Sequence, residues 1–277
     1  LGQRGYRVTL AEATRELGGR VTRESRLPGL TEWQRVRDYR LQQIDVMPNV
    51  EIFRESKLNV DEVLAVEADH IVFATGAAWR ADGFGRSHLH PLTALSPGAR
   101  ILTPDDVMAG HLPDGPTVIF DDDSFYMGGV IAEQVRRANL PVSLVTPENI
   151  VSAWCEYTSE QYQVQKHLLE LGVEIKTAHS LLAYDGREVT IFCTHTGRQQ
   201  SLKADALIMV TARRPRDEVY QDLNHRMEGE VQPPFHSVQR IGDCEAPAII
   251  AAAIHSGHRY ARELDTEPDP DVPLRLE

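Results

Sequence analysis

The chain has few cysteines and no long apolar run. Its 277 residues include only Cys155, Cys193 and Cys244, which are far apart and form no C-x-x-C pair. This spacing supports neither a disulfide framework nor a cysteine metal site. No run approaches the ~18 consecutive apolar residues that a membrane helix needs, and the N-terminus shows no secretory signal. We therefore expect no membrane partner and a location in the reducing cytoplasm.

Basic residues are scarce relative to acids. The chain has 29 Lys and Arg against 41 Asp and Glu, a formal net charge of −12. Such a chain repels phosphate backbones, so we expect no nucleic-acid partner. The apolar content of 42% and charged content of 25% are ordinary for a soluble globular protein. The length is sufficient for two domains.

The sequence also lacks the common catalytic and metal-binding patterns. It contains no Ser-His-Asp set, no H-E-x-x-H and no Walker loop. His255 and His258 lie three residues apart and would share a helix face, but no third ligand is apparent. We therefore predict no catalytic residue and no metal site in this chain.

Hydrophobic patterning predicts an α/β fold built from two nucleotide-domain-like parts. A strand at 6–10, a helix at 31–44, two short strands within 50–66 and a strand at 70–74 precede a connector at 77–110. A β-α-β unit then spans 117–145, and the last strand and helix follow at 239–241 and 247–264. We predict two nested Rossmann-like domains. The first comprises 1–105 plus 235–265, the inserted one 106–234, and 266–277 is an extended tail.

The first nucleotide signature begins at the end of the first strand. Glu12, followed by Ala13, stands where doubly wound sheets place an acid that accepts hydrogen bonds from ribose hydroxyls. Gly18 and Gly19 would let the backbone approach a pyrophosphate, and Arg20 could neutralise phosphate charge. The alternatives are a surface acid and an ordinary turn. The strand that usually opens such a domain, with its G-x-G-x-x-G turn, would precede Leu1, so we expect the first domain to lack it.

Two further turns would face the same ligand. Thr75 and Gly76 end a buried strand close to where a dinucleotide would lie, although they could be a plain strand-to-loop break. Gly242 and Asp243 follow the last strand, and Asp243 could bond a ribose or ribityl hydroxyl near a helix start that offers N–H groups to phosphate. The alternative is that Asp243 serves only as a helix N-cap.

The turn of the inserted part has acids where glycines are expected. Counting back from Gly128 as the third glycine of G-x-G-x-x-G, the first two positions hold Asp123 and Phe125. Phe125 would block close backbone approach, and the carboxylates of residues 121–123 would repel a pyrophosphate. We therefore predict that NAD(P) does not bind here. The acids themselves are most simply interpreted as a solvated turn.

These segments resemble the C-terminal half of the trimethylamine/dimethylamine/histamine dehydrogenase family, which is related to 2,4-dienoyl-CoA reductase and glutathione-reductase-type flavoproteins. The segments that carry the resemblance, which spans nearly the whole chain, are VTLAEA with ELGGRV, LPGLTEW, VFATGA, VIFDDDSFYMGG and IGDCEAPAIIAAAIHSGHRYAREL.

The resemblance implies an ADP or FAD site lined by Glu12, Gly18, Gly19, Arg20 and Asp243. FMN, a 4Fe-4S cluster and the substrate pocket would lie in an N-terminal TIM barrel outside this chain. It also implies electron transfer to an electron-transferring flavoprotein and a homo-oligomeric full-length protein that oxidises CH–NH donors. We expect the isolated chain to be inactive. The alternatives are an FAD/NAD(P)-dependent reductase subunit and a non-enzymatic ADP-binding interaction module.

Overall fold

The structure, a computed structural model, describes residues 1–228 and 233–266 and divides into two compact units. Unit 1 comprises Leu1–Val21, Arg35–Ala77 and the described residues from Pro215 onward. Unit 2 comprises Thr22–Gln34 and Ala78–Arg214. The chain passes from unit 1 to unit 2 at β4 (Ala77–Trp79) and returns at β13 (Arg213–Pro215), which pair with each other. Helix α1 (Gly19–Glu24) begins in unit 1 and ends in unit 2.

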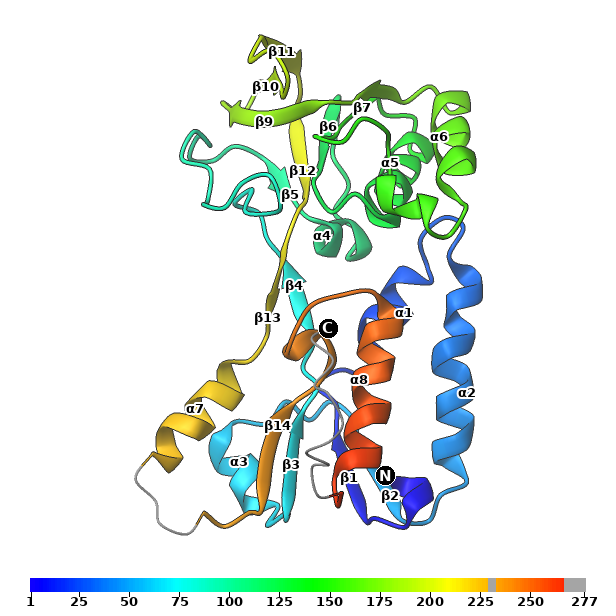
Figure 1. The fold of residues 1–277 in the computed structure, drawn as a ribbon, viewed down its shortest axis with the longest axis vertical. Helices are drawn as coiled ribbons and strands as arrows, with labels where there is room; N and C mark the ends of the chain where they lie inside the picture. The colour runs from blue at the N-terminus through cyan, green and yellow to red at the C-terminus, as the bar shows by residue number, and fades with distance from the viewer. Residues whose placement is uncertain (229–232, 267–277) are drawn as a thin grey trace, which may run out of the picture. The chain divides into compact units, whose positions relative to one another are not determined.

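Unit 1 contains two separate parallel strand pairs, β1 with β2 and β3 with β14. Its other elements are short helices and two longer ones (Figure 1). In chain order the elements are η1 (Gly2–Arg4), β1 (Val8–Ala11), α2 (Gln34–Asp45), β2 (Val50–Phe53), α3 (Val60–Ala65), β3 (His70–Phe73), α7 (Glu218–Met227), β14 (Ser237–Arg240), η4 (Gly242–Cys244) and α8 (Ile250–Glu263).

Helix α3 replaces the second of the two strands predicted within 50–66. Its start is fixed by a capping box, in which the Asn59 side chain accepts from the backbone of Glu62 and the Glu62 side chain accepts from the backbone of Asn59. Reciprocal satisfaction of two helix N–H groups stabilises even a short helix. The strand prediction was therefore wrong for this segment, because local capping outweighs the alternating pattern.

Unit 1 has a small core. Its buried cluster consists of Phe73, Leu223 and Cys244, with half-buried side chains around it. Helix α2 buries no residue, and α8 buries only Tyr260. Three of the four residues of β1 are exposed. The two strand pairs and the long helices therefore leave much of their apolar surface uncovered.

Unit 2 is built on a five-stranded parallel sheet in the order β5-β12-β6-β7-β8, joined by the antiparallel three-stranded sheet β11-β10-β9. In chain order its elements are η2 (Thr31–Trp33), β5 (Ile101–Leu102), α4 (Pro104–Met108), β6 (Thr117–Asp121), α5 (Tyr126–Arg137), β7 (Val142–Val145), η3 (Ala153–Glu156), α6 (Gln161–Glu170), β8 (Glu174–Lys176), β9 (His179–Tyr184), β10 (Glu188–Cys193), β11 (Gln199–Lys203) and β12 (Ala206–Val210).

The central strands of unit 2 are buried on both faces. Along β6, Ile119 packs into the cluster that includes α5 and α6, whereas Val118 and Phe120 pack into the cluster that includes β9 and β10. Figure 1 shows the helices and the antiparallel strands on opposite sides of the sheet. Such two-sided burial explains why residues 118–120 of β6 and all of β12 are apolar rather than alternating.

The segment predicted as a connector, 77–110, contains ordered elements. Besides β4 and β5 it contains α4, which starts with Pro104 after a capping box between Thr103 and Asp106. The prediction of an irregular connector was therefore wrong in these parts. Nearly all of the predicted tail lies outside the described residues.

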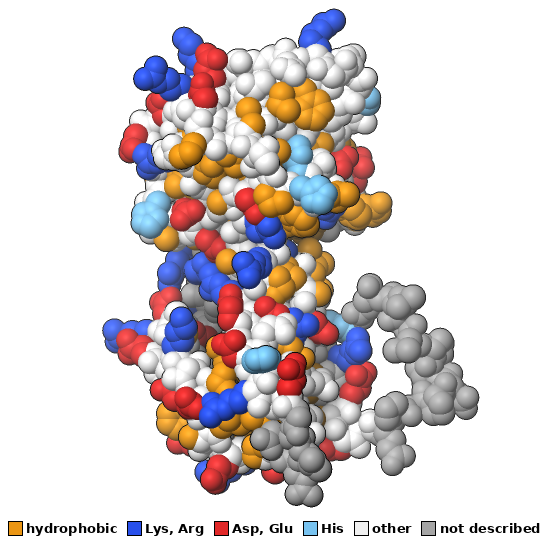
Figure 2. Space-filling view, turned by 90° about the vertical axis from the view of Figure 1, so that its left-hand side faces the viewer, with side chains coloured by type: hydrophobic (Ala, Val, Ile, Leu, Met, Phe, Trp, Pro, Cys, Tyr) orange, Lys and Arg blue, Asp and Glu red, His pale blue; other side chains and the backbone are white. Residues whose placement is uncertain are grey.

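Two features of the structure agree with the sequence: the surface carries charges of both signs, and the helices are short. Figure 2 shows acidic and basic side chains interspersed over the visible face, with hydrophobic side chains between them. Among residues 1–228 and 233–266, no helix combines the length and apolar character needed to cross a bilayer.

Candidate functional site

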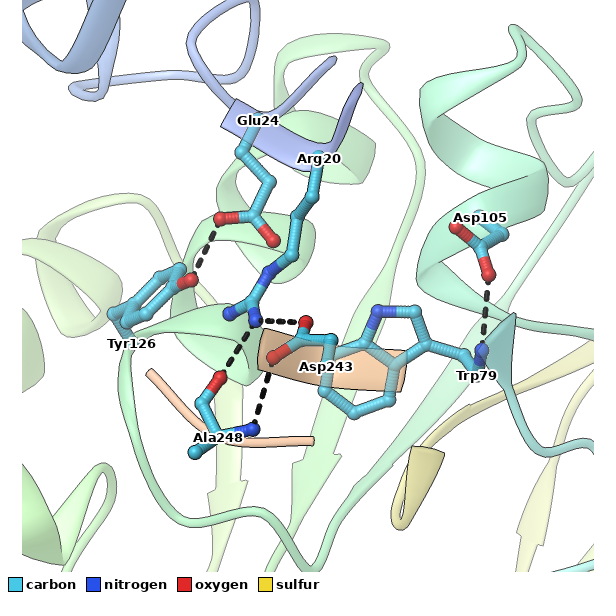
Figure 3. Close-up of polar contacts among 7 residues, drawn as sticks. All are labelled: Arg20, Glu24, Trp79, Asp105, Tyr126, Asp243 and Ala248. Atoms are coloured by element: carbon cyan, nitrogen blue, oxygen red, sulfur yellow. Dashed lines mark hydrogen bonds and ion pairs between the residues drawn. The ribbon is translucent and has the colours of Figure 1, made fainter. Parts of the chain in front are cut away.

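The segments that follow β1 and β14 meet through Arg20 and Asp243. The Arg20 Nη1 group donates to Asp243 Oδ2 at 2.8 Å and to the Ala248 carbonyl at 2.6 Å (Figure 3). The Ala248 N–H donates to Asp243 Oδ1 at 3.1 Å. The side chains of Arg20 and Asp243 keep only 17% and 9% of their exposure. Two predicted site residues thus form one compact polar cluster, hereafter the Arg20 clasp (Arg20, Asp243 and Ala248).

Asp243 does not act as the helix cap proposed as its alternative role. The N-cap of α8 is Ile249, whose side chain makes no capping hydrogen bond. Asp243 instead fixes the residue just before that cap. The clasp therefore sets where the chain enters α8, while the first N–H groups of α8 receive no side-chain cap.

Glu12 lies directly after β1 and is half-buried. Its Oε1 accepts from both the N–H and the Oγ1 of Thr14, at 2.8 and 2.9 Å. These two hydrogen bonds orient the Glu12 carboxylate. The adjacent Ala13 is exposed. Both residues belong to unit 1, as do the clasp residues.

The two glycines before Arg20 adopt conformations that L-residues rarely take. Gly18 has φ of 101° and Gly19 has φ of 48°, and both are exposed. A Cβ built on Gly19 would meet no atom within 4 Å. The backbone here is therefore bare on the side that a phosphate group would approach.

Thr75 and Gly76 lie beside the segment after β14. Thr75 Oγ1 hydrogen-bonds to the Arg216 carbonyl and lies 3.0 Å from Cys244 Sγ. Gly76 has φ of 77°, and a Cβ there would also meet open space. Gly242 has φ of 60° and donates its N–H to Ser256 Oγ at 3.0 Å, so α8 uses that donor.

Sequence reasoning did not identify Cys244 and Ala248 as parts of this cluster. Cys244 is fully buried in the unit 1 core beside Thr75, and Ala248 contributes only backbone atoms. A backbone contribution leaves no residue-type signal. The C-E-A-P run between Asp243 and Ala248 shows only that the chain turns before the helix.

In unit 2, the turn after β6 is filled by its own acids. Asp121 is fully buried; its Oδ1 accepts from the Ser124 N–H at 2.9 Å, whereas its Oδ2 has no hydrogen-bond partner among the residues that the structure describes. Burial, reinforced by the charge of Asp123, raises the pKa of the Asp121 carboxyl to about 8. Asp121 is therefore largely protonated at neutral pH.

Asp122 is also buried, with 3% exposure, and accepts from the Ser87 N–H at 2.9 Å. The interpretation of these acids as a solvated turn was therefore wrong for Asp121 and Asp122. Desolvated carboxyl groups here act as internal packing and hydrogen-bonding groups.

The glycine space of this turn is occupied as well. A Cβ on Gly128 would lie 2.3 Å from Asp121 Oδ2, so the carboxyl group rests directly on the glycine. Ser124 takes a left-handed conformation with φ of 59°, and its carbonyl accepts from the Trp154 N–H of η3 at 3.0 Å. The chain's own atoms thus cover the backbone that would face a pyrophosphate in a glycine-rich turn.

Unit 2 contains two further polar contacts that the sequence motifs do not indicate. The Tyr126 hydroxyl donates to Oε2 of the fully buried Glu24 at 2.6 Å. Asp105 accepts from the Trp79 N–H at 2.9 Å and pairs with Arg23 at 2.7 Å. Figure 3 shows the Glu24–Tyr126 and Trp79–Asp105 contacts. These contacts join segments that are far apart in the sequence, and they stabilise the fold of unit 2.

No metal centre is visible in the described ranges, and two of the thiols have pKa values shifted in opposite directions. Among those residues no group of three or more His, Cys, Asp or Glu side chains could hold a metal ion. A hydrogen bond from the Thr196 side chain, followed by backbone hydrogen bonds from His195 and Thr196, lowers the pKa of the Cys193 thiol. Burial, followed by the charge of Glu160, raises the pKa of the Cys155 thiol to about 11. That thiol is therefore protonated at neutral pH and a poor nucleophile.

Comparison with solved structures defines the fold class. The flavoprotein disulfide reductase RclA of Escherichia coli superposes with a TM-score of 0.55 over 96% of this chain and 67% of its own, at 15% identity. This likeness places the chain in the flavoprotein reductase fold class. No protein-family model matches the chain.

Two relatives of higher identity match nearly the whole chain. Histamine dehydrogenase from Rhizobium sp. 4-9 superposes with a TM-score of 0.94 and 43% identity, covering 99% of this chain and 42% of its own. Dimethylamine dehydrogenase of Hyphomicrobium sp. (strain x) is 31% identical over 100% of this chain and 41% of its own length. The chain is homologous to the C-terminal part of these dehydrogenases, as its motifs indicated, and spans about two fifths of their length.

Proposed function

We propose that this chain is the nucleotide-binding half of an FMN/iron–sulfur amine dehydrogenase-like oxidoreductase, and that unit 1 binds ADP or the ADP part of FAD. In this proposal both units are nested Rossmann-like domains. Unit 1 serves a structural role and supports electron transfer. Unit 2 is a degenerate NAD(P)-binding domain.

The observation that carries this proposal is the convergence of separate motifs in unit 1. The glycine turn after β1 and the Gly242-Asp243 turn after β14 meet in the Arg20 clasp. Open α/β sheets bind nucleotides outside the carboxyl ends of their parallel strands. Two stretches far apart in the sequence, each following a parallel strand of unit 1, thus meet in one polar cluster.

The chemistry of these residues fits a nucleoside diphosphate. Gly19 and Gly76 offer bare backbone, Arg20 supplies a guanidinium group, and Glu12 supplies an oriented acceptor for hydroxyl groups. The uncapped start of α8 adds N–H groups suited to an anion. Asp243 balances the charge of Arg20. Selection of a nucleoside diphosphate would therefore depend on the positions of the hydrogen-bonding groups as much as on charge.

Unit 2, by contrast, is unsuited to NAD(P). Asp121 occupies the space beside Gly128, Phe125 stands at a position where a small residue is required, and η3 covers the Ser124 carbonyl. A dinucleotide would have to displace all three. This argues against the reductase-subunit alternative, which needs a working second site.

The remaining parts of the proposal concern the longer protein. We infer that FMN, a 4Fe-4S cluster and the amine pocket belong to a TIM-barrel region outside this chain. We also infer an electron-transferring flavoprotein as electron acceptor, a homo-oligomeric assembly and a cytoplasmic location. The 277-residue chain by itself would then oxidise no amine, and amine-dependent dye reduction by the purified chain would contradict this.

An absorbance spectrum combined with calorimetry tests the nucleotide proposal. Purified chain should bind ADP in an isothermal titration, and Arg20→Ala should weaken that binding by about ten-fold or more. Arg259→Ala, on the exposed side of α8, is the matched control and should bind as the unchanged chain does. Absence of ADP binding by folded protein would refute the proposal.

The same spectrum separates the two nucleotides. A bound yellow chromophore would identify FAD, whereas an adenine absorbance without flavin would identify ADP. ADP binding without flavin also fits the non-enzymatic interaction module. Adding back the N-terminal region of the longer protein and assaying amine oxidation would then distinguish the two, because only the oxidoreductase half would restore turnover.

A further inference from the structure

Two large aromatic side chains of unit 2 are exposed next to each other at η3. Trp154 keeps 44% of its exposure and Tyr157 keeps 83%. Their ring centroids lie 5.5 Å apart, at an interplanar angle of 35°. Folded proteins gain free energy by covering such rings, because each one removes a large apolar area from water. Exposed Trp and Tyr side chains in mutual contact are therefore typical of a surface that binds another molecule.

The backbone that carries these two rings is held in place. The Trp154 N–H donates to the Ser124 carbonyl at 3.0 Å, and the Glu160 N–H donates to the Cys155 carbonyl at 3.0 Å. Cys155 lies between the two rings in the chain and is buried, which anchors the turn in the interior of unit 2. Aromatic rings on a fixed backbone lose little conformational entropy when a partner binds them.

The same turn contains backbone conformations that cost free energy. Ser152, the N-cap of η3, has φ of 53°, and Ser159, which follows the turn, has φ of 61°. Ser124, whose carbonyl holds Trp154, has φ of 59°. Residues other than glycine rarely adopt this left-handed region and keep it only where the surrounding structure enforces it. Such conformations are concentrated at functional sites, which favours a binding role for the exposed rings.

A guanidinium group already lies on this surface. The Arg86 Cζ atom is 4.8 Å from the centroid of the Trp154 ring. The loop that carries Arg86 is fixed by the next residue, because the Ser87 N–H donates to Asp122 Oδ2 at 2.9 Å. The negative face of an aromatic ring attracts a cation. Arg86 therefore shows which charge the Trp154 face accepts.

Carboxylates lie on both sides of Tyr157 in the chain. Glu156 belongs to η3, Glu160 follows it, and both are exposed. The Glu160 carboxylate accepts from the Thr158 hydroxyl at 2.6 Å. Residues 146–165 include three Glu and no Lys, Arg or His. Even with Arg86 included, this surface combines open aromatic faces with an excess of negative charge.

A positively charged side chain suits both features. Aromatic faces attract cations, carboxylates pair with them, and arginine combines planar stacking with hydrogen bonds to a carboxylate. The net charge of −12 would also attract a basic partner from a distance. A second copy of the chain suits the surface less well, because it carries the same excess of negative charge.

We propose that the η3 patch (Arg86, Trp154, Glu156, Tyr157 and Glu160) is a docking site for a basic, arginine-containing segment of another protein. An arginine of the partner stacks on the open Tyr157 ring and pairs with the Glu156 carboxylate, and the charge of Glu160 adds to the attraction. The patch lies entirely in unit 2, so the proposal is independent of the nucleotide function proposed for unit 1.

A short peptide serves as the probe for the partner segment. The peptide Arg-Gly-Arg-Gly-Arg, blocked at its C-terminus and labelled with a fluorophore at its N-terminus, is titrated with the full 277-residue chain and followed by anisotropy. We expect saturable binding. The same peptide with citrulline in place of arginine keeps the shape of the side chain and loses its charge. It should bind about ten-fold or more weakly.

Two variants and two matched controls locate the binding surface. Tyr157→Ala and Glu156→Gln should each weaken binding of the arginine peptide by about five-fold or more, since each removes one proposed contact. Tyr39→Ala and Glu51→Gln remove an exposed tyrosine and an exposed acid of unit 1 and should bind as the unchanged chain does. Circular dichroism checks that each variant is folded. The citrulline comparison needs no variant.

Several results would overturn the docking proposal. They are absence of saturable binding by the folded chain, equal binding of the arginine and citrulline peptides, and unchanged binding by folded Tyr157→Ala. Equal losses in Tyr157→Ala and Tyr39→Ala would show general attraction to an acidic protein and would also contradict it. A chain that is dimeric in size-exclusion chromatography and binds no peptide would assign the η3 patch to a second copy instead. ADP titration of Arg20→Ala tests the nucleotide function separately.

Discussion

At the scale of single residues, the Arg20 clasp combines two ionised groups with little remaining exposure. Removing one partner of such a pair leaves the other charge poorly solvated, which costs more than the pair itself contributes. The clasp also fixes the backbone before α8 through Ala248. Its loss should therefore loosen the start of α8 as well as change the local charge.

The variant Asp243→Ala should lower the free energy of unfolding by about 2–4 kcal/mol. Glu263→Ala removes a partner of the exposed pair Arg259–Glu263 and should cost at most about 0.5 kcal/mol. Urea unfolding followed by circular dichroism measures both. Equal costs for the two variants would show that the clasp is no stronger than a surface ion pair.

Asp121 makes the stability of unit 2 depend on pH. Its pKa is raised by burial to about 8 in the folded state, so the folded protein retains a proton that the unfolded chain releases near pH ~4. The stabilisation is complete below the unfolded pKa, falls as pH rises, and is lost once pH passes about 8. Asp121→Asn should flatten this decline, as measured by urea unfolding between pH ~5 and ~9.

The matched control for this experiment is Asp45→Asn, at an exposed position at the end of α2. It should retain the pH dependence of the unchanged chain. An unaltered slope in Asp121→Asn would mean that the carboxyl is hydrated and ionised in the folded protein.

At the scale of elements, α5 shows how close packing replaces the ligand space of a glycine turn. Gly128→Ala would place a methyl group 2.4 Å from the Asp121 Cγ, so the helix or the acid must move. We expect a loss of about 1–3 kcal/mol in the free energy of unfolding. Gly129→Ala is the neighbouring control: its nearest contact would be Val164 Cγ1 at 3.1 Å, and the gain in helix propensity offsets the tighter fit.

Thermal and urea unfolding of these two α5 variants gives the comparison. If Gly128→Ala leaves the free energy of unfolding unchanged, Asp121 does not rest against the helix. That result would also weaken the argument that NAD(P) is excluded from unit 2.

The sequence predicted many of the strands and the longer helices of both units. Buried runs such as 117–120 and 206–210 are easily recognised because two-sided burial leaves them almost entirely apolar, with Thr117 as the exception. Helix α3 and the elements within 77–110 were not recognised, because capping boxes and tertiary contacts decide such short segments.

For the candidate site, the sequence identified the residue types but not their mutual bonds. Arg20 and Asp243 were both expected near a ligand, yet nothing in a linear sequence shows that they bond to each other. Likewise, the carboxylates at 121–123 were predicted to repel phosphate. Their burial could not be predicted, since it depends on the loop at Ser87 and on η3 packing over the turn.

At the scale of the whole molecule, the two units differ in how much they bury. Unit 2 has two extensive clusters around its sheet, whereas the cluster of unit 1 has three buried apolar residues in the described part of the chain. Because the free energy of folding increases with buried apolar area, we expect the free energy of unfolding to be lower for unit 1 than for unit 2.

Calorimetry of the full chain should therefore show two transitions, with unit 1 melting first. Hydrogen exchange should assign the earlier transition, with weak protection in β1 and β3 and strong protection in β6 and β12. ADP should raise only the lower midpoint. A single cooperative transition with uniform protection would contradict this difference between the units.

Within the described residues, β1 and β3 each pair with another strand along one edge, and this has a practical consequence for handling the protein. A strand edge that offers unpaired N–H and C=O groups is a template for copies of itself, and cross-β pairing between molecules needs no unfolding to begin. Concentrated stocks of the chain should therefore slowly develop thioflavin T fluorescence. Charged substitutions such as Thr9→Lys, placed on that edge, should delay its onset.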